Sequence, residues 1–549
     1  MEISQDKPVV AVAGATGFIG RALAPALGEA VSLRGLSRSA RPDGRGGYAT
    51  WRACDLFSLR DAERALEGAH TAVYLVHSMM PSARLTQGSF EDMDLICADN
   101  FARAANECGV QRIVYLGGLL PDDDSGLSRH LKSRREVEQA LARYDTPLVT
   151  LRAGLVIGSG GSSWQILAKL VRRLPLMACP GWTQTLTQPI ALPDVVTLLA
   201  ASVMRADVAP GTYDVGGPDV LSYQAMMKKT AKAMGVRRPM LRVPLMTVGL
   251  SRLWVSLVTG APKELVAPLI ESLVHPMIAG RRELQEKLGV PGRSVDVALA
   301  EALVEERAAK IVVAGSPARR RKKAPPLARS VQRLSLPAGR DAAWVADEYC
   351  RWLPTWLLAR VLRVEVDAEG RCRFYAPWMK RPLLELTLAH ARSGADRVLF
   401  YITGGVLARQ GGRPRLEFRE VLGSGHVLAA VHDYRPALPW FVYASTQAVV
   451  HLAVMRAFGR HLDRLGRAAS QSPSPSPSPA GLTPDIGGAR TRRARALLSS
   501  SSHGRRSSLA DRQHRHDRAR GVDERHRDDS GLEVFPDDEP DTDAHKPHR

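Results

Sequence analysis

The chain has 549 residues, more than one compact core usually holds, so a division into two or three domains is expected. Its 45% hydrophobic and 24% charged residues are ordinary for a soluble globular protein and exclude a chain that is unfolded throughout. The net charge of +20 belongs to the folded part and its linker, because residues 471–549 are close to neutral. Such a surface suits a phosphorylated cofactor, an acidic lipid surface or, least specifically, nucleic acid; the alternative is that the charge only keeps the surface hydrated.

Three further features bear on metals, compartment and membranes. The six cysteines stand far apart without a CxxC pair, which indicates reduced thiols and no structural zinc. The first residues, MEISQDKP, lack a basic start followed by an apolar run, so a cytoplasmic protein is expected. Residues 436–455 are uncharged over a length that could cross a membrane, but Ser445, Thr446, Gln447 and His451 interrupt them. A half-buried helix is therefore favoured over a membrane span, and peripheral contact with a membrane is left open.

Short apolar strands alternate with helices over the first part of the chain. The expected strands are residues 8–13, 31–37, 72–76, 112–116, 148–152 and 211–215, and the expected helices are residues 18–28, 59–66, 91–108 and 134–142. This alternation predicts an α/β fold with a doubly wound parallel sheet. Residues 221–313 are expected to be almost wholly helical and to form a lid on that sheet.

A break follows at residues 315–329, where prolines and five consecutive basic residues would prevent a packed core. The first domain is therefore expected to cover residues 1–314, and residues 315–330 to form a linker. A basic signal for the nucleus or for nucleic acid is the alternative.

The second domain is expected at residues 331–468. A helix is predicted at residues 342–361, followed by strands at residues 371–375, 383–390, 397–403, 415–422 and 427–433 and a long helix at residues 440–465. An antiparallel sheet wrapped on a terminal helix makes an α+β cup that can hold an apolar ligand. Tyr375, Trp378, Tyr401 and Trp440 are candidates for its lining, with ordinary aromatic packing as the alternative.

The tail, residues 469–549, includes an alternating Ser-Pro run and continues almost without apolar periodicity. It is expected to be disordered. A frame-shifted end to a GC-rich gene would give a similar composition.

A glycine-rich turn lies between the first strand and the first helix. Gly14 permits a tight turn, Gly17 lets the backbone approach a pyrophosphate, and Gly20 lets helix and strand pack closely. The whole turn, Gly14, Thr16, Gly17, Phe18, Ile19 and Gly20, is therefore predicted to hold the pyrophosphate of a dinucleotide at the amino end of the helix. A tight turn without a ligand is the alternative.

The end of the second strand distinguishes the two dinucleotides. A carboxylate there would bind the ribose hydroxyls of NAD, whereas a cation would pair with the additional phosphate of NADP. The strand ends with Ser37 and Arg38 and has no acidic residue at that place. NADP(H) is therefore favoured over NAD(H).

This part of the chain resembles the short-chain dehydrogenase/reductase superfamily, in its atypical or extended, epimerase-like branch. The likeness covers about residues 8–300 and rests on the glycine turn and on residues 54–56, 74–78, 109–116, 152–154, 189–190 and 194–196. It implies a Rossmann domain that binds NAD(P), with Asp55 and Leu56 at the adenine and Val76 and His77 at the end of the fourth strand. Within that branch it is most similar to the group that includes quinone-oxidoreductase-like proteins.

The resemblance also implies a catalytic tyrosine, a lysine four residues later and a serine. His130 stands at the tyrosine position, Arg134 at the lysine position, and Gly117 and Gly118 at the serine position, so all three places differ. His130 is a candidate catalytic acid, Arg134 a candidate partner and Lys132 a further candidate. A histidine that only packs on a helix is the alternative.

Residues 331–468 resemble the START-like helix-grip domains, on the order of their elements and on Tyr443 to His461. Two functions remain open. The first is an NAD(P)H-dependent oxidoreductase that transfers hydride to a hydrophobic carbonyl or quinone-like substrate. The second is a non-catalytic NADP(H) sensor or scaffold with a ligand-binding second domain; carriage of a lipid by that domain is a third interpretation.

Overall fold

The structure is a computed structural model. It describes residues 7–77, 83–121, 126–243, 247–314, 327–356, 363–367, 371–376, 378–409, 411–421, 423 and 425–471. These residues belong to one compact unit. Residues 472–549 of the expected tail and most of the expected linker lie outside the described residues, so the predictions made for them stay predictions. Residues 469–471, expected in the tail, instead end the last helix.

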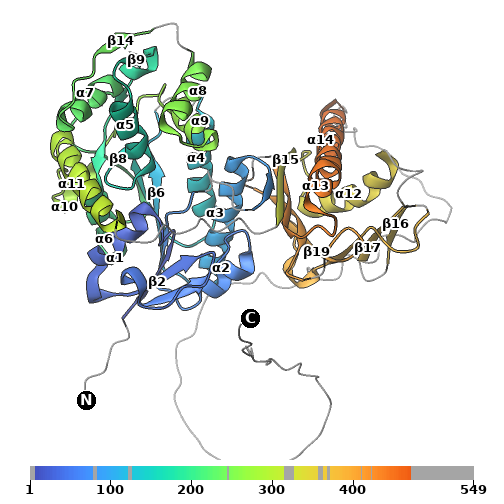
Figure 1. Cartoon of the computed structure of the whole chain (residues 1–549). Helices are drawn as coiled ribbons and strands as arrows, with labels where there is room; N and C mark the ends of the chain where they lie inside the picture. Colours follow the sequence, from blue (N-terminus) through green and yellow to red (C-terminus); the bar gives the residue numbers. More distant parts are fainter. Residues whose placement is uncertain are drawn as a thin grey trace, which may run out of the picture. The chain divides into compact units, whose positions relative to one another are not determined.

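A seven-stranded parallel sheet forms the centre of the first domain (Figure 1). In spatial order its strands are β12 (Gly211–Val215), β7 (Leu148–Ala153), β6 (Arg112–Gly118), β4 (Thr71–Tyr74), β1 (Val9–Ala13), β2 (Ser32–Ser37) and β3 (Thr50–Ala53). The chain winds outward in both directions from the middle of this sheet, which confirms the doubly wound α/β fold. β3 was not expected from the sequence, because its four residues carry no continuous apolar pattern.

Helices cover both faces of this sheet. One face carries α1 (Phe18–Leu27) and α6 (Leu192–Met204), and the other carries α2 (Leu59–Leu66), α3 (Phe90–Glu107) and α4 (Arg129–Leu141). The alternation of β1 explains this, since Val10 and Val12 pack with α1 while Ala11 and Ala13 pack with α2 and α3. α4 begins five residues before the predicted start because Ser128 caps it by accepting a hydrogen bond from the backbone of Leu131 at 3.3 Å.

The lid is a mainly helical layer with its own buried cluster. Its helices are α5 (Ser162–Arg173), α7 (Tyr223–Ala233), α8 (Val248–Thr259), α9 (Lys263–Ser272), α10 (Glu283–Leu288) and α11 (Val295–Ala314). Its short strands pair as β8 (Val156–Ile157) with β11 (Ile190–Ala191), β9 (Met177–Cys179) with β14 (Met240–Arg242), and β10 (Leu186–Thr187) with β13 (Leu221–Ser222). Residues 221–313 are thus mostly helical as predicted, apart from β13 and β14.

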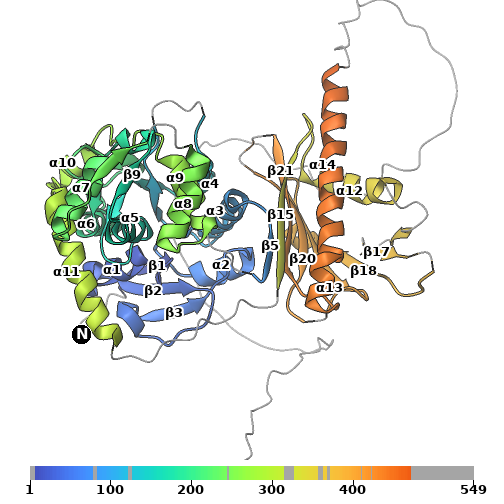
Figure 2. The ribbon, with the colours of Figure 1, turned by 45° about the horizontal axis from the view of Figure 1, so that its top comes forward.

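The second domain is built on an eight-stranded sheet (Figure 2). In spatial order its strands are β16 (Arg363–Val366), β17 (Arg371–Tyr375), β18 (Leu384–Leu388), β19 (Arg397–Gly404), β20 (Arg415–Glu420), β21 (His426–Tyr434), β15 (Ala328–Ser335) and β5 (Leu85–Gln87). α12 (Ala342–Trp356), α13 (Trp440–Ser445) and α14 (Gln447–Gln471) pack with it around one apolar core. This confirms the α+β architecture.

Two of these strands depart from the predicted arrangement. β15 begins at Ala328, inside the segment expected to be a linker. β5 comes from the first domain, yet it pairs in parallel with β15, Thr86 lying opposite Arg329. The second sheet is therefore completed by a strand from the amino-terminal part of the chain.

Acidic residues of α3 join the two sheets. Asp92 accepts a hydrogen bond from Arg333 at 2.7 Å, and Asp99 accepts one from Arg419 at 2.6 Å. Val331 of β15 lies in the same buried cluster as the apolar side of α3. α3 is consequently buried on almost all sides, which accounts for its buried carboxylates.

Within the described residues no group of histidine, cysteine and acidic side chains could hold a metal ion. All six cysteines are free thiols, although Cys350 and Cys372, which are 22 residues apart, bring their sulfurs to 3.8 Å. No described helix is both long enough and apolar enough to cross a membrane.

Candidate functional site

The glycine turn holds the first strand and the first helix in close approach. Gly14 has a φ of +90°, and a Cβ there would lie 2.8 Å from the carbonyl oxygen of Leu75. A Cβ on Gly20 would lie 2.5 Å from the carbonyl oxygen of Gly14, so only glycine allows helix and turn to approach this closely. Gly17 directly precedes α1 and supplies no side-chain cap, which leaves the N–H groups of the first turn available to an anion.

A cavity of about 400 Å³ lies over this turn. Its lining includes eight of the predicted cofactor residues, namely Gly14, Thr16, Gly17, Arg38, Asp55, Leu56, Val76 and His77. Phe18, Ile19 and Gly20 lie in the first turn of α1 and are not part of the lining. The structure thus brings most of the predicted cofactor residues around one cavity.

The cavity wall beyond β2 is basic and polar. Ser37, Arg38, Ser39 and Arg41 line it, and the hydroxyl of Ser37 donates to the carbonyl oxygen of Ser39 at 2.6 Å. Arg41 was not predicted, although it lies only three residues after Arg38 in the sequence. These two guanidinium groups suit a phosphate on the adenosine ribose.

Asp55 has a partner that the sequence did not indicate. Arg329 of β15 forms an ion pair with it, and the Arg329 side chain is 3% exposed. The same guanidinium lies 4.3 Å from the ring centroid of Phe57. The expected adenine contact is therefore held by the second domain, across 274 residues of sequence.

A buried charged cluster lies beside the cavity. Arg134 pairs with Asp94, whose side chain is 1% exposed, and Ser133 donates to the same carboxylate at 3.3 Å. The Nδ1 atom of His77 lies 3.0 Å from Asp94. Burial, and then the charge of Arg134, lower the pKa of His77, so its ring is neutral at pH 7. Arg134 consequently balances the negative charge of Asp94. Because a guanidinium stays protonated, it cannot release a proton as a lysine can.

His130 lies at the boundary between two cavities. Its ring centroid is 5.5 Å from that of His77, which lines the cavity over the glycine turn, while His130 itself lines a separate one. The cavity over the glycine turn is called the dinucleotide cavity below, after the ligand predicted for it from the sequence. Burial, followed by the charge of Arg134, holds the pKa of His130 well below its usual range. The imidazole is therefore neutral at pH 7, a form with one N–H donor and one acceptor nitrogen. Its Nδ1 atom is buried and has no hydrogen-bond partner among the described residues.

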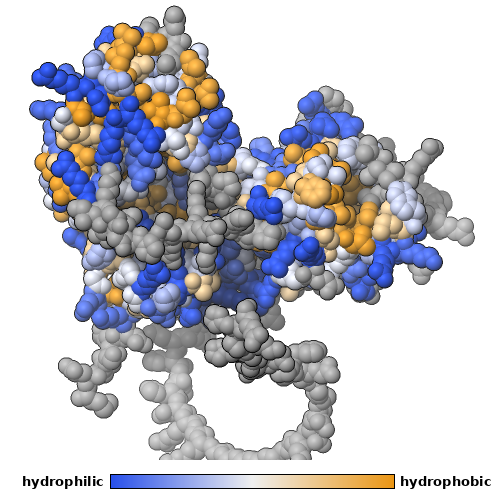
Figure 3. Space-filling view, viewed as in Figure 1, coloured by the Kyte–Doolittle hydropathy of each residue, from blue (hydrophilic) through white to orange (hydrophobic). Residues whose placement is uncertain are grey.

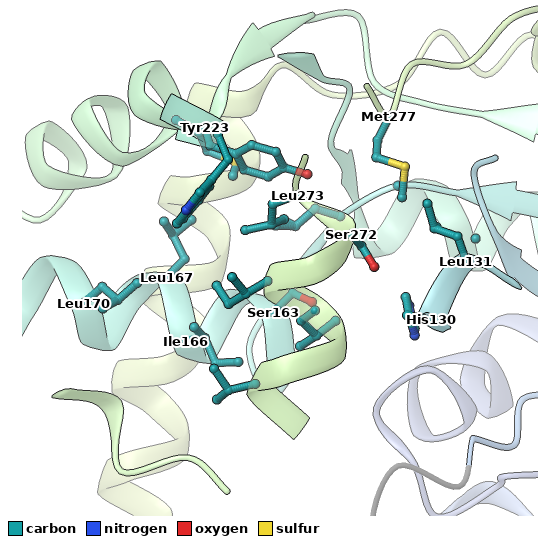
Figure 4. A pocket seen from close by; sticks show the side chains of 18 of the residues that line it. His130, Leu131, Ser163, Ile166, Leu167, Leu170, Tyr223, Ser272, Leu273 and Met277 are labelled. Carbon is teal, nitrogen blue, oxygen red and sulfur yellow. The ribbon is translucent and has the colours of Figure 1, made fainter. Parts of the chain in front are cut away.

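The cavity beyond His130 is apolar (Figure 4). It holds about 160 Å³ between α4, α5, α7 and α9. His130 and Ser272 lie at one end, and Leu167, Leu170 and Tyr223 toward the other. Gly118, one of the two glycines at the expected serine position, also lines it, whereas Lys132 does not. The lid thus supplies most of a hydrophobic pocket next to the dinucleotide cavity.

A third cavity, of about 420 Å³, lies inside the second domain. It is lined mainly by apolar side chains of the sheet, α12 and α14. Of the four aromatic residues predicted to line it, Trp378 does so, while Tyr375, Tyr401 and Trp440 are not part of the lining.

Comparison with known proteins shows a family similarity within the first domain. Residues 10–125 match the NAD dependent epimerase/dehydratase family. These residues contain the glycine turn and the central strands of the parallel sheet. The match confirms the resemblance predicted for this part of the chain; the START-like resemblance of residues 331–468 stays a prediction.

Particular proteins are similar over parts of the chain. The auxiliary protein GraX of Staphylococcus aureus is 32% identical over 147 residues, which are 26% of this chain and 43% of GraX, so the chain spans less than half of that relative. The NADPH-dependent quinone oxidoreductase QOR2 of Escherichia coli, solved with NADPH, is 17% identical and aligns over 54% of this chain and 99% of its own, with a TM-score of 0.43. A nucleoside-diphosphate-sugar epimerase of Staphylococcus aureus is 15% identical over 54% of this chain and 100% of its own, also with a TM-score of 0.43.

Proposed function

We propose that this protein is an NAD(P)H-dependent oxidoreductase that transfers hydride to a hydrophobic carbonyl or quinone-like substrate. The observation that carries this proposal is the junction of two cavities at His77 and His130. The cavity on one side is built on the glycine turn, and the cavity on the other is apolar. A hydride donor and a hydrophobic acceptor would therefore meet at the two imidazoles.

NADP(H) is proposed as the preferred dinucleotide. Arg38 and Arg41 both line the cavity after β2, where a phosphate on the ribose would lie. Asp55, which lines the same cavity, is neutralised by Arg329. The local charge thus favours the more anionic of the two dinucleotides.

The dinucleotide supplies the hydride when it is bound. The chain's own residues orient the acceptor and exclude water from it, because Leu131, Ile166, Leu167 and Leu273 surround the pocket. His130 would donate a hydrogen bond from neutral imidazole to the acceptor's carbonyl oxygen. Arg134 remains bound to Asp94 and keeps the adjoining wall in place.

A second candidate function is a non-catalytic NADP(H) sensor or scaffold. It is favoured by the replacement of the expected tyrosine and lysine by His130 and Arg134, of which the arginine is fixed by Asp94. A sensor would bind NADPH but pass hydride to no acceptor. The two functions therefore differ in turnover and not in binding.

The test is NADPH oxidation with a series of quinones and enones, comparing Ser163→Phe with Ser162→Phe. Ser163 is half-buried and lines the apolar pocket, whereas the neighbouring Ser162 is exposed and does not. We expect turnover in the unmodified protein, a KM raised about tenfold or more by Ser163→Phe, and no change with Ser162→Phe. NADPH affinity should be the same in all three. If NADPH binds and no acceptor oxidises it, the sensor interpretation replaces the oxidoreductase.

A further inference from the structure

The dinucleotide cavity and the second-domain cavity share a wall made of β5 and β15. Thr86 of β5 lines the first cavity, while its partner in the register, Arg329 of β15, lines the second. Gln87, the next residue of β5, donates from its side chain to the carbonyl oxygen of Ala448 in α14 at 2.9 Å. A displacement of these two strands would therefore change the shape of both cavities.

Arg329 is the side chain that reaches from one cavity to the other. It belongs to the lining of the second-domain cavity, but its guanidinium pairs with Asp55, which lines the dinucleotide cavity. Asp433 accepts a hydrogen bond from the same guanidinium at 3.1 Å and one from Arg415 at 2.7 Å. Asp433 has a φ of +54°, and no other non-glycine residue among those described has a positive φ. Such a strained backbone persists only where the surrounding contacts hold it.

The second-domain cavity combines an apolar wall with one polar group that lacks a partner. The hydroxyl of Tyr434 donates to the carbonyl oxygen of Leu407 at 2.5 Å and so accepts from the side-chain amide of Gln447, also at 2.5 Å. This leaves the Oε1 atom of Gln447 as a buried acceptor without a hydrogen-bond partner among the described residues. His451 also lines the cavity, and burial lowers its pKa to about 4, so it is neutral at pH 7.

The cavity is open to solvent at its apolar rim. Trp378 and Val450 line it and are 76% and 57% exposed. Hydrophobic side chains gather on the surface over α13 and α14 (Figure 3). A hydrophobic molecule therefore has an entrance that does not cross the dinucleotide cavity.

We propose that the second domain binds an apolar molecule carrying a hydroxyl group, and that this molecule and the dinucleotide strengthen each other's binding through Arg329. The hydroxyl would donate to Gln447, and the apolar body would fill the space against Arg329. Displacing water from that space strengthens the pairing of Arg329 with Asp55. When Asp55 is neutralised, it repels the phosphates of the dinucleotide less. Binding of the apolar molecule should therefore strengthen the binding of the dinucleotide, and the reverse. This inference rests on dinucleotide binding, as does the proposed function.

The experiment measures the Kd of NADPH for the full chain by fluorescence, with and without saturating decan-1-ol. Calorimetry establishes the binding of decan-1-ol and of decyl methyl ether, which has the same apolar body but no hydroxyl. We expect decan-1-ol to bind about fivefold more tightly than the ether, and Gln447→Leu to abolish that difference. We further expect decan-1-ol to lower the Kd of NADPH at least about fivefold.

Arg329→Gln and Arg333→Gln form a matched pair. Both arginines lie on β15 and pair with acids of the first domain, but Arg333 lines neither cavity. In Arg329→Gln, NADPH should bind more weakly because Asp55 is no longer neutralised, and decan-1-ol should no longer change its Kd; in Arg333→Gln the coupling should persist. Thermal unfolding of both variants shows whether either has lost its fold.

The outcomes separate this inference from the proposed function. Binding of both ligands with independent affinities overturns the coupling and leaves the oxidoreductase intact. If the coupling persists in Arg329→Gln and is lost in Arg333→Gln, then Arg333 and not Arg329 transmits it, which contradicts the inference. Failure of decan-1-ol to bind overturns the second-domain site, whereas failure of NADPH to bind overturns both proposals.

Discussion

The two arginines after β2, Arg38 and Arg41, are the side chains that should distinguish the dinucleotides. We expect Arg38→Ser and Arg41→Ser each to weaken NADPH binding about tenfold, because each removes a charge-assisted hydrogen bond to phosphate. NADH affinity should change little. Calorimetric titration of both dinucleotides is the measurement, with the exposed Arg52 as control, since Arg52→Ser lies outside the cavity lining. Equal losses for NADPH and NADH would contradict the assignment of this wall to the ribose phosphate.

His432 makes the stability of the fold depend on pH. Burial, and then the charge of Arg415, lower its pKa to about 3. The unfolded chain binds this proton near pH 6.5, so between about pH 6.5 and 3 the unfolded state holds more protons and stability falls as the pH falls. From pH 7.5 to pH 5 this residue should remove about 2 kcal/mol from the free energy of unfolding.

Urea unfolding of His432→Gln at both pH values measures that contribution. The variant should lose about 2 kcal/mol less than the unmodified protein over this range. His390→Gln, at an exposed histidine, should behave like the unmodified protein. An unchanged pH dependence in His432→Gln would show that the ring is not held neutral by burial.

The contacts of single residues could be predicted from the sequence only where the partners are close along the chain. The glycine turn and Arg38 were predictable, because their chemistry depends on neighbours within a few residues. The partner of Asp55 was not, since Arg329 lies 274 residues away and no local pattern links them. The role of Arg134 was equally hidden, because it depends on Asp94 in a different helix.

At the scale of elements, α3 carries the contacts that hold the two sheets together. Arg419, whose side chain is 1% exposed, pairs with Asp99 of α3 and with Glu417. Arg419→Met would leave Asp99 buried without its cation, although Glu417 keeps its ion pair with Arg397, and we expect a loss of about 3 kcal/mol or more in the free energy of unfolding. Denaturant unfolding measures it.

An exposed ion pair supplies the comparison for that loss. Arg363 is 62% exposed and pairs with Glu365 at 3.2 Å, so Arg363→Met should cost about 1 kcal/mol or less. Similar losses in the two variants would mean that the contact between α3 and the second sheet adds nothing to stability.

Most strands and helices followed from periodicity, because each buries one regular apolar face. The exceptions have physical reasons. β5 has only three residues, and β15 carries arginines whose partners lie in the first domain, so neither shows the alternation of an independent strand. Both acquire their structure from each other and from β21.

At the scale of the whole molecule, three cavities lie along one path through the described residues. The apolar pocket adjoins the dinucleotide cavity at His77 and His130, and the dinucleotide cavity adjoins the second-domain cavity at β5 and β15. The dinucleotide cavity, which is the middle one of the three, is built on the glycine turn. Both proposals require that a dinucleotide binds in it.

Calorimetric titration of the full chain with NADPH and NADH tests this claim most directly. Gly17→Asp places a carboxylate where the pyrophosphate would lie, and Gly181→Asp makes the same change at an exposed glycine with open space around it. We predict that NADPH binds more tightly than NADH, that Gly17→Asp abolishes binding of both, and that Gly181→Asp binds as the unmodified protein does. Absence of binding by either dinucleotide at millimolar concentration, or binding that survives Gly17→Asp, would contradict the account.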